Sequence, residues 1–140
     1  MYLLDTDHLT PYFHYAESNP ELVARANLEL AAGRLFVPII AVEEMVRGAL
    51  QTLRDHEKKR DAPRGYLFFQ RVITTTCALP LRPFDSAAEA IFRQFAPDVR
   101  RIGLRDCRIA AIALSEDLVV VTRNVRHFNQ VPGLNIENWL

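Results

Sequence analysis

The feature that most constrains the fold of this chain is the repeated alternation of strand-like runs with longer helical patterns. Runs rich in apolar or β-branched residues occur at positions 1–4, 35–37, 74–79, 118–121 and 134–136. The segments between them space their apolar residues as helices do. Strands that alternate with helices in this way form a mainly parallel sheet covered by helices. The sequence therefore predicts an α/β sandwich around a mainly parallel sheet of roughly five strands.

The chain has the size and continuity of one domain. Its 140 residues contain no internal repeat, no low-complexity tract and no linker-like segment. A chain of this length can bury about two-thirds of the surface that it exposes when unfolded, which is enough for a single hydrophobic core. We therefore expect residues 1–140 to form one domain.

Composition favours a soluble protein of the cytoplasm. No apolar run approaches the roughly 20 residues that a membrane-spanning helix needs, and an acid at position 5 argues against a signal peptide. The two cysteines, Cys77 and Cys107, are too few for a disulfide framework. A formal net charge of +0 excludes a strongly basic nucleic-acid clamp.

One glycine interrupts the clearest helical pattern. Apolar residues recur at helical spacing from Ile40 to Leu53, with Gly48 among them. Glycine inside a helix costs about 1 kcal/mol relative to alanine, so Gly48 predicts close packing against a neighbour. The charged residues 54–65 that follow are expected to form a solvated helix end and loop.

Acidic residues from distant parts of the chain are predicted to meet at one edge of the sheet. Asp5 ends the first strand, and Asp106 opens the helix before the strand at 118–121. Glu43 and Glu44 lie in the first turns of the helix after the second strand. Carboxyl ends of parallel strands and N-termini of the connecting helices share one edge, where ligands bind. That edge also receives the polar residues after the fourth strand, Thr122, Asn124 and His127.

Three carboxylates near one point repel one another unless a cation lies between them. Oxygen ligands without cysteine favour Mg²⁺ or Mn²⁺ over zinc. Magnesium held by a few carboxylates, with waters still bound, can activate water for attack on a phosphodiester. Each acid alone is equally consistent with helix capping; their convergence is what favours a functional site.

Four segments together resemble a known family. They are LLDTDHL (3–9), VEEMVRG (42–48), IGLRDCRIAAIAL (102–114) and VVTRNVRHFNQVPGLNIENW (120–139). In this order they resemble the PIN-domain ribonucleases, specifically the toxin component of VapBC-type toxin–antitoxin pairs. The resemblance spans essentially the whole chain. It implies a PIN-like three-layer α/β/α sandwich, Mg²⁺- or Mn²⁺-dependent endoribonuclease activity, an antitoxin that occludes the site, and a homodimer.

The resemblance also implies roles for individual residues. Asp5 matches the first acid of the family and Asp106 the third, and both would be metal ligands. Glu44 matches the second acid better than Glu43 does, because it lies four residues before Gly48. Thr122 and Asn124 match the polar pair after the fourth strand. These residues, together with His127, are the candidate catalytic set.

His127 departs from the family pattern, because similar sequences usually carry an acid at this position. An imidazole removes one negative charge and offers nitrogen in place of oxygen, which should weaken Mg²⁺ relative to Mn²⁺. Two alternatives stay open: His127 lies away from the metal, or the chain is a catalytically weakened PIN domain that binds RNA or an antitoxin without cutting.

Arginines flank these candidate site residues. They are Arg105 and Arg108 beside Asp106, and Arg123 and Arg126 after the fourth strand. Guanidinium groups there are placed to hold RNA phosphates on either side of a scissile bond. A solvated face with ion pairs to neighbouring or partner acids is an equally good interpretation. Apolar residues in 9–15 and 45–53 leave room for a dimer or antitoxin surface.

Other interpretations of single residues are weaker. Asp5 as the nucleophile of a haloacid-dehalogenase-type enzyme needs a lysine at the site, and the only lysines, Lys58 and Lys59, lie in the charged stretch. Cys107, in an alanine-rich helix, is expected to pack as a small apolar residue. Asp7 is expected to cap a helix or to support the site. The remaining histidines, His8, His14 and His56, are expected at the surface or in packing.

Overall fold

A computed structural model describes all residues, 1–140. Its elements follow one another as β1 (Tyr2–Leu4), α1 (Thr6–His14), the short 3-10 helix η1 (Ala16–Ser18), α2 (Pro20–Ala31), β2 (Leu35–Pro38), α3 (Ile39–Lys58), α4 (Ala62–Cys77), β3 (Leu81–Arg82), α5 (Ser86–Gln94), α6 (Pro97–Arg100), α7 (Leu104–Ser115), β4 (Val119–Val121), α8 (Val125–Phe128) and β5 (Ile136–Glu137).

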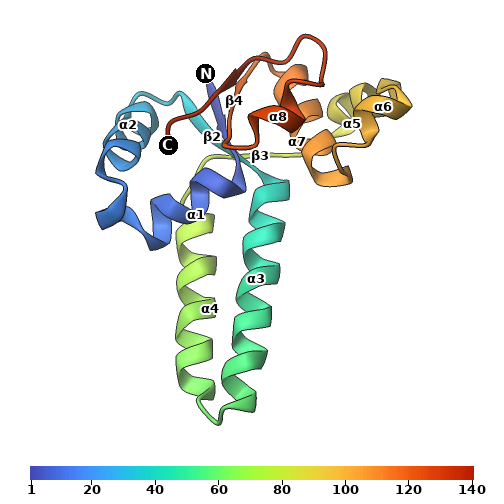
Figure 1. Cartoon of the computed structure of the whole chain (residues 1–140). Coiled ribbons are helices and arrows are strands. Elements are labelled where there is room, and N and C mark those ends of the chain that lie inside the picture. The colour runs from blue at the N-terminus through green and yellow to red at the C-terminus, as the bar shows by residue number, and fades with distance from the viewer.

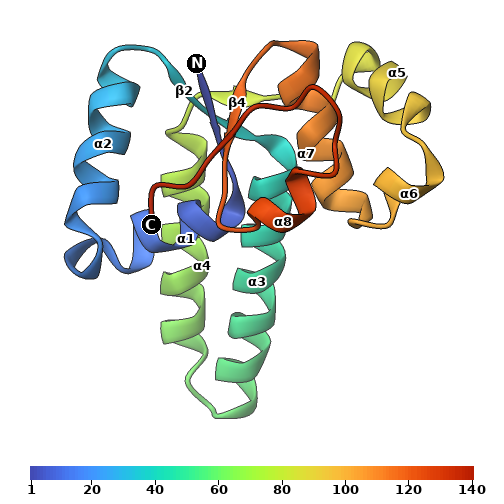
Figure 2. The same ribbon diagram turned by 45° about the horizontal axis from the view of Figure 1, so that its top comes forward.

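The sheet has five strands in the order β3-β2-β1-β4-β5, and every neighbouring pair is parallel. The strands run through the middle of the molecule, with α2 to one side and α5, α6 and α7 to the other (Figure 2). This arrangement confirms the expected α/β/α fold. The first and fourth strands, which carry the candidate residues, are neighbours at the centre of the sheet.

Side chains of the central strands alternate between two hydrophobic cores. Leu3 and Val120 face a core that contains residues of α5, α6, α7 and α8, whereas Leu4 and Val121 face a second core with residues of α1 to α4. All four side chains are at most 1% exposed. Helices on both faces therefore fix β1 and β4, and with them the polar residues that directly follow each strand.

The prediction of a strand at 74–79 is wrong, because α4 continues to Cys77. Its threonine hydroxyls bond back within the helix: Thr74 donates to the carbonyl of Gln70, and Thr76 to that of Val72. These bonds satisfy the hydroxyls locally, and α4 packs along α3, so tertiary packing overrides the β-branched preference. The third strand forms directly afterwards, at Leu81–Arg82.

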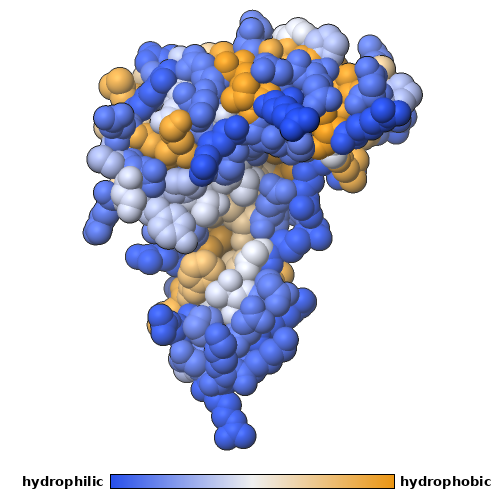
Figure 3. Space-filling model, in the orientation of Figure 1, coloured by the Kyte–Doolittle hydropathy of each residue, from blue (hydrophilic) through white to orange (hydrophobic).

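Helices α3 and α4 form a long hairpin that projects from the body of the molecule (Figure 1). Gly65 is the glycine that this packing requires, since a Cβ there would lie 2.8 Å from Leu53 Cδ1. Gly48 is exposed, and a Cβ there would meet nothing within 4 Å, so the predicted close packing at Gly48 is wrong. The tip of the hairpin is hydrophilic, as expected for residues 54–65 (Figure 3).

Two further features concern the hydrophobicity of the helices and the state of the cysteines. None of the helices combines the length and hydrophobicity needed to traverse a membrane. Both cysteines are free thiols. Cys107 is 1% exposed within the core, where burial raises the pKa of its thiol. A buried, protonated thiol fits the expected packing role.

Candidate active site

Asp5 is the most deeply placed candidate residue, directly after β1. It is 7% exposed and is the N-cap of α1, where its Oδ1 accepts a hydrogen bond of 2.7 Å from the Thr6 amide. Its Oδ2 accepts a second bond, of 2.9 Å, from the hydroxyl of Thr122. Thr122 is itself fully buried after β4. The carboxylate is thus held between two neighbouring central strands, which fixes its position.

The surroundings of Asp5 oppose its negative charge. Burial, followed by the neighbouring charges of Asp7 and Asp106, raises the pKa of Asp5 to about 7, although the hydrogen bonds from Thr122 and Thr6 act in the opposite direction. A carboxyl group with such a pKa gains strongly from a nearby cation. Among these causes, the charge of Asp106 contributes least.

Asp7 supports the loop after β4. Its Oδ2 accepts a 2.9 Å bond from the backbone amide of Arg123 and a 3.2 Å bond from the Thr122 hydroxyl. Its Oδ1 lies 2.7 Å from Nδ1 of His8. Of the two roles expected for Asp7, the cap belongs to Asp5, and Asp7 supports the site.

Sequence reasoning missed the part played by His8. The side chain is 0% exposed, and its Nε2 accepts a 3.1 Å bond from the backbone amide of Trp139. Because Nε2 accepts, Nδ1 carries the proton and donates it to Asp7. His8 therefore ties the C-terminal segment to the carboxylate that supports Thr122. Only its position three residues after Asp5, on the inner side of α1, could have indicated this.

On the other side of the site, Asp106 lies in the first turn of α7. Its Oδ2 accepts a 3.0 Å bond from Nδ2 of Asn124 and lies 3.0 Å from Nδ1 of His127. Asn124 and His127 also contact each other, at 2.8 Å. The structure thus brings His127 onto Asp106.

These three contacts have no fully matched set of protons. If Nδ1 of His127 carries a proton for Asp106, it faces the amino group of Asn124, which also donates. If Nδ1 is bare, it accepts from Asn124 but meets a lone pair of Asp106. A divalent cation beside the bare imidazole and the carboxylate removes this second conflict, because both atoms then donate lone pairs to it.

Glu44 approaches the site from α3. Its Oε2 accepts a 2.5 Å bond from the hydroxyl of Thr6, and its Oε1 lies 3.1 Å from Nη1 of Arg105. Glu43 instead pairs with Arg47, which holds the pKa of Glu43 below its usual range. Of the two adjacent acids, Glu44 is thus the one that contacts Thr6, the residue after Asp5.

The donor set fits a magnesium or manganese ion that keeps part of its water shell. No three acidic, histidine or cysteine side chains lie close enough together to hold a metal by themselves. Mg²⁺ does not require such a cage, because one or two carboxylates with waters and substrate phosphates complete its six positions. Asp5 and Asp106 are the two candidates for such carboxylates, and they are linked through Thr122, which donates to Asp5, and Asn124, which donates to Asp106.

The four arginines differ in what their guanidinium groups contact. Arg105 pairs with Glu44 and, at 3.6 Å, with Glu43. Arg108 lies over two aromatic rings, with its Cζ 5.4 Å from the centroid of Phe84. Arg123 and Arg126 are exposed, and no acid lies within ion-pair distance of either. The latter two are therefore the arginines open to a phosphate in this structure.

Comparisons with known proteins place this geometry in context. A family model described as "PIN domain" matches residues 2–134. The chain is 30% identical over 141 residues to ribonuclease VapC2 of Haemophilus influenzae, covering 99% of this chain and 98% of the relative. It is 29% identical over 123 residues to the tRNA(fMet)-specific endonuclease VapC of Salmonella typhimurium, covering 88% of each.

Solved structures give the same result. A DNA-bound VapBC structure from Salmonella typhimurium superposes with a TM-score of 0.70 at 28% identity, covering 99% of this chain and 98% of the other. VapBC2 from Rickettsia felis, bound to a promoter DNA fragment, superposes with a TM-score of 0.73 at 21% identity, with the same coverage. The second of these likenesses concerns the fold alone.

Proposed function

This chain belongs to the PIN-domain family, and from that premise we propose that it is a Mg²⁺- or Mn²⁺-dependent endoribonuclease, the toxin of a toxin–antitoxin pair. The names of its relatives, a ribonuclease and a tRNA-specific endonuclease, support RNA as the substrate. The observation that carries the proposal is the hydrogen-bonded link between two acids from distant parts of the chain: Thr122 donates to Asp5, and Asn124, whose amide bonds to Thr122, donates to Asp106.

The proposed chemistry is hydrolysis of a phosphodiester by water. A divalent ion held by Asp5 and Asp106 would supply positive charge for the phosphate and lower the pKa of a bound water. The chain's own residues prepare the site for this. Thr122 and the Thr6 amide orient the Asp5 carboxylate, and Asn124 orients that of Asp106.

Glu44 has a different place in this proposal. Its carboxylate accepts from the hydroxyl of Thr6, the residue after Asp5, and pairs with Arg105, which partly neutralises its charge. A carboxylate in this position is suited to accept a proton from an attacking water. Thr6 contacts both acids, Asp5 through its amide and Glu44 through its hydroxyl, and so fixes their positions relative to each other.

The proposed partners are an antitoxin, a second copy of the chain and RNA. The superposing structure at 28% identity is a VapBC complex, which supports an antitoxin protein that binds over the acids of this chain. A homodimer is part of the same proposal. The exposed guanidinium groups of Arg123 and Arg126 are the contacts we assign to RNA phosphates.

A second candidate function is an RNA- or antitoxin-binding PIN domain with weakened catalysis. The observation in its favour is that His127, which replaces an acid of the family pattern, directly contacts Asp106. A protonated imidazole there would compete with a metal ion for the same carboxylate. The retained acids Asp5, Glu44 and Asp106 favour the catalytic proposal, because a binding module does not need mutually repelling carboxylates.

Cleavage of a structured RNA by the purified, chelator-treated protein tests the proposal. The substrate is unfractionated tRNA, with Mg²⁺, with Mn²⁺ or with EDTA. We expect cleavage that needs a metal, is lost in Asp5→Asn and is kept in Glu57→Gln, a matched loss of an exposed acid on α3. Cleavage that persists in Asp5→Asn indicates a contaminating nuclease. Binding of tRNA without cleavage by either metal favours the second candidate.

A further inference from the structure

Gly48 lies in the middle of α3, where its own chain gives no reason for a glycine. Glycine inside a helix costs about 1 kcal/mol relative to alanine. Gly48 is exposed, and a Cβ placed there would have no other atom within 4 Å. Neither conformation nor packing within the chain therefore requires this residue. The open space above it is the remaining explanation, and that space belongs to a pocket.

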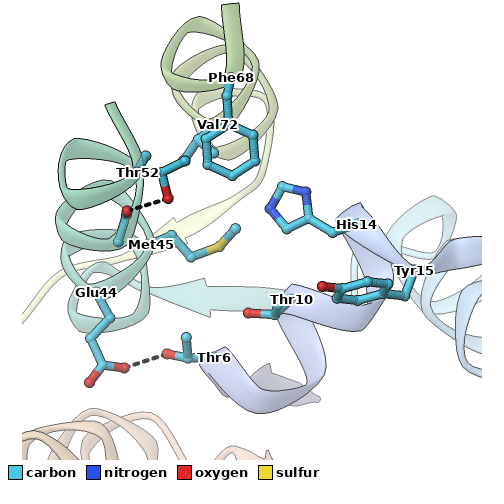
Figure 4. A pocket seen from close by; sticks show the side chains of 11 residues that line it. Thr6, Thr10, His14, Tyr15, Glu44, Met45, Thr52, Phe68 and Val72 are labelled. Carbon is cyan, nitrogen blue, oxygen red and sulfur yellow. Dashed lines mark hydrogen bonds between the residues drawn. The ribbon is translucent and has the colours of Figure 1, made fainter. Parts of the chain in front are cut away.

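The pocket lies between α1 and the hairpin of α3 and α4, and we call it the Gly48 pocket (Figure 4). Its volume is about 500 Å³. One end is formed by Thr6 and Glu44, which also belong to the candidate active site. The pocket is thus continuous with the acids, and a molecule that reaches the acids can extend into it.

The lining combines an apolar floor with planar rings. Met45, Ala49 and Val72 are nearly buried and form the floor. The rings of His14 and Phe68 stack with their centroids 5.4 Å apart and are directed toward the pocket (Figure 4). Burial and the nearby charge of Arg71 lower the pKa of His14, so its ring is neutral at pH 7.

Polar groups in the pocket are uncharged apart from Glu44, at the end next to the acids, and are suited to a neutral ligand. No lysine or arginine lines it, so it offers no site for a phosphate. The Thr52 hydroxyl donates to the carbonyl of Gly48 and keeps its lone pairs for a ligand. The Thr10 hydroxyl also faces the pocket. Hydroxyls beside aromatic rings are typical of sites that hold an unstacked nucleobase.

A second hollow lies next to the Gly48 pocket and differs from it in charge. The two share Thr10 and Tyr15, and the second is lined by polar residues that include the exposed Arg123 and the acid Asp7. Tyr15, 60% exposed, borders both. A pocket with aromatic rings for a base, beside a hollow with an arginine for a phosphate, matches the two parts of a nucleotide. An apolar peptide side chain would not use the arginine.

We propose that the Gly48 pocket holds the base of an RNA nucleotide next to the scissile phosphodiester. This inference rests on the proposed nuclease function and adds a base-recognition site to it. Stacking on protein rings is a common way to hold single-stranded RNA. Gly48 keeps the pocket open, which accounts for its place in the helix.

The test fills the pocket in the protein and removes the base from the RNA. Gly48→Leu places a side chain in the open space, with Gly48→Ala as the matched control; both should fold, with thermal midpoints equal to or above that of the unchanged protein. The cut in tRNA is mapped first. Synthetic RNAs that span it then carry an abasic nucleotide on one side or the other. Tyr15→Ala, at an exposed ring, is a second variant that does not endanger folding.

We expect Gly48→Leu to cut the intact RNA roughly tenfold more slowly in kcat/KM, a loss of the size that stacking of one base accounts for. Removing one flanking base should cost the unchanged protein a similar factor. The two losses should not add. On that abasic RNA, the kcat/KM of Gly48→Leu should therefore lie within about twofold of that of the unchanged protein. Gly48→Ala should behave like the unchanged protein, and Tyr15→Ala should show a smaller loss of the same pattern.

Two results would overturn the proposal. If Gly48→Leu cleaves intact RNA at an unchanged rate, the pocket does not hold a base. Weaker binding of an antitoxin by the same variant would then show that the pocket binds a protein. An equal loss on intact and abasic RNA shows general damage to the site. Failure of the unchanged protein to cut any RNA is a separate result, because it removes the proposed function and this inference with it.

Discussion

Asp5 and Asp106 meet at one edge of the sheet, yet their surroundings are opposite. Asp5 is 7% exposed and accepts bonds from the Thr6 amide and from the Thr122 hydroxyl, which it shares with Asp7. The Asp106 side chain is 23% exposed and takes part in a triangle with Asn124 and His127 whose protons cannot all be matched. The Asp5 half of the site is held in place and disfavours a negative charge. The Asp106 half is more exposed, and its hydrogen bonds are not all satisfied.

This difference indicates a division of labour. The buried half sets position, because its carboxylate is held by two central strands. We propose that the open half sets which ion the site takes, because the His127 imidazole contacts the Asp106 carboxylate and would lie beside a bound cation. Substitutions in the buried half should therefore change the rate and stability most, whereas substitutions in the open half should change selectivity.

The largest expected effect is that of Asp5→Asn. The amide keeps the shape and can still accept from Thr122, but it loses the charge that would hold the proposed cation. We expect RNA cleavage to fall at least about 100-fold. Asn124→Ala, on the open side, should cost about tenfold. Initial rates on tRNA with saturating Mn²⁺ measure both, and equal losses would contradict the division between the two halves.

The raised pKa of Asp5 predicts how stability depends on pH without metal. Between the ordinary value of 3.8 and about 7, folded Asp5 holds a proton that the unfolded chain has lost. The free energy of unfolding should therefore fall as pH rises from about 4 to 7, by an amount of the order of 4 kcal/mol, and then level off. Asp5→Asn should remove this fall and be the more stable protein at pH 8.

Urea unfolding in EDTA, from pH 4 to pH 8, measures this for both proteins. Other groups titrate in this range, so the informative quantity is the difference in unfolding free energy between Asp5→Asn and the unchanged chain. It should grow up to about pH 7. A difference that stays constant with pH would show that Asp5 is ionised as easily in the folded state as in the unfolded one.

His127→Asp should change which ion supports cleavage. An acid in place of the imidazole supplies an oxygen ligand and one more negative charge, both of which favour Mg²⁺. We expect the ratio of the Mg²⁺ rate to the Mn²⁺ rate to rise about tenfold, with a smaller change in the Mn²⁺ rate itself. His56→Asp, at the far end of α3, is the control. An unchanged ratio would place His127 outside the metal's reach.

The smallest expected effects concern the arginines. Arg123→Ala should reduce the slope of log K against log salt for RNA binding by about 1, as loss of one phosphate contact does. Arg105→Ala should leave that slope unchanged, since Arg105 pairs with Glu44 and Glu43. Fluorescence anisotropy with labelled tRNA and the inactive Asp5→Asn background provides the slopes. If Arg105→Ala reduced the slope and Arg123→Ala did not, the RNA would bind along α7 instead.

Much of the site was predictable because topology dictates it. Once β1, β4 and α7 are assigned, Asp5, Asp106 and Thr122 must meet at one edge, whatever the side chains do. Contacts that depend on rotamers and packing were not predictable in this way. The tie from Trp139 through His8 to Asp7 joins residues 131 positions apart, and nothing in the sequence links them.

The errors have a common physical cause. Thr74 to Thr76 have strand-forming side chains, but their hydroxyls are satisfied inside α4 and the helix packs on α3. Gly48 and Gly65 lie on the same hairpin, and spacing alone cannot tell which of them faces a neighbour. In both cases local preference was clear and tertiary contact decided the outcome.

Isothermal titration calorimetry tests most directly whether Asp5 and Asp106 together hold the ion. In this experiment Mn²⁺ is titrated into chelator-treated protein at pH 7.5. The unchanged chain should bind about one Mn²⁺, and both Asp5→Asn and Asp106→Asn should bind it at least about tenfold more weakly, while Glu57→Gln does not differ. Equal Mn²⁺ affinity in all four proteins would contradict the account, since the two carboxylates would then not form the metal site.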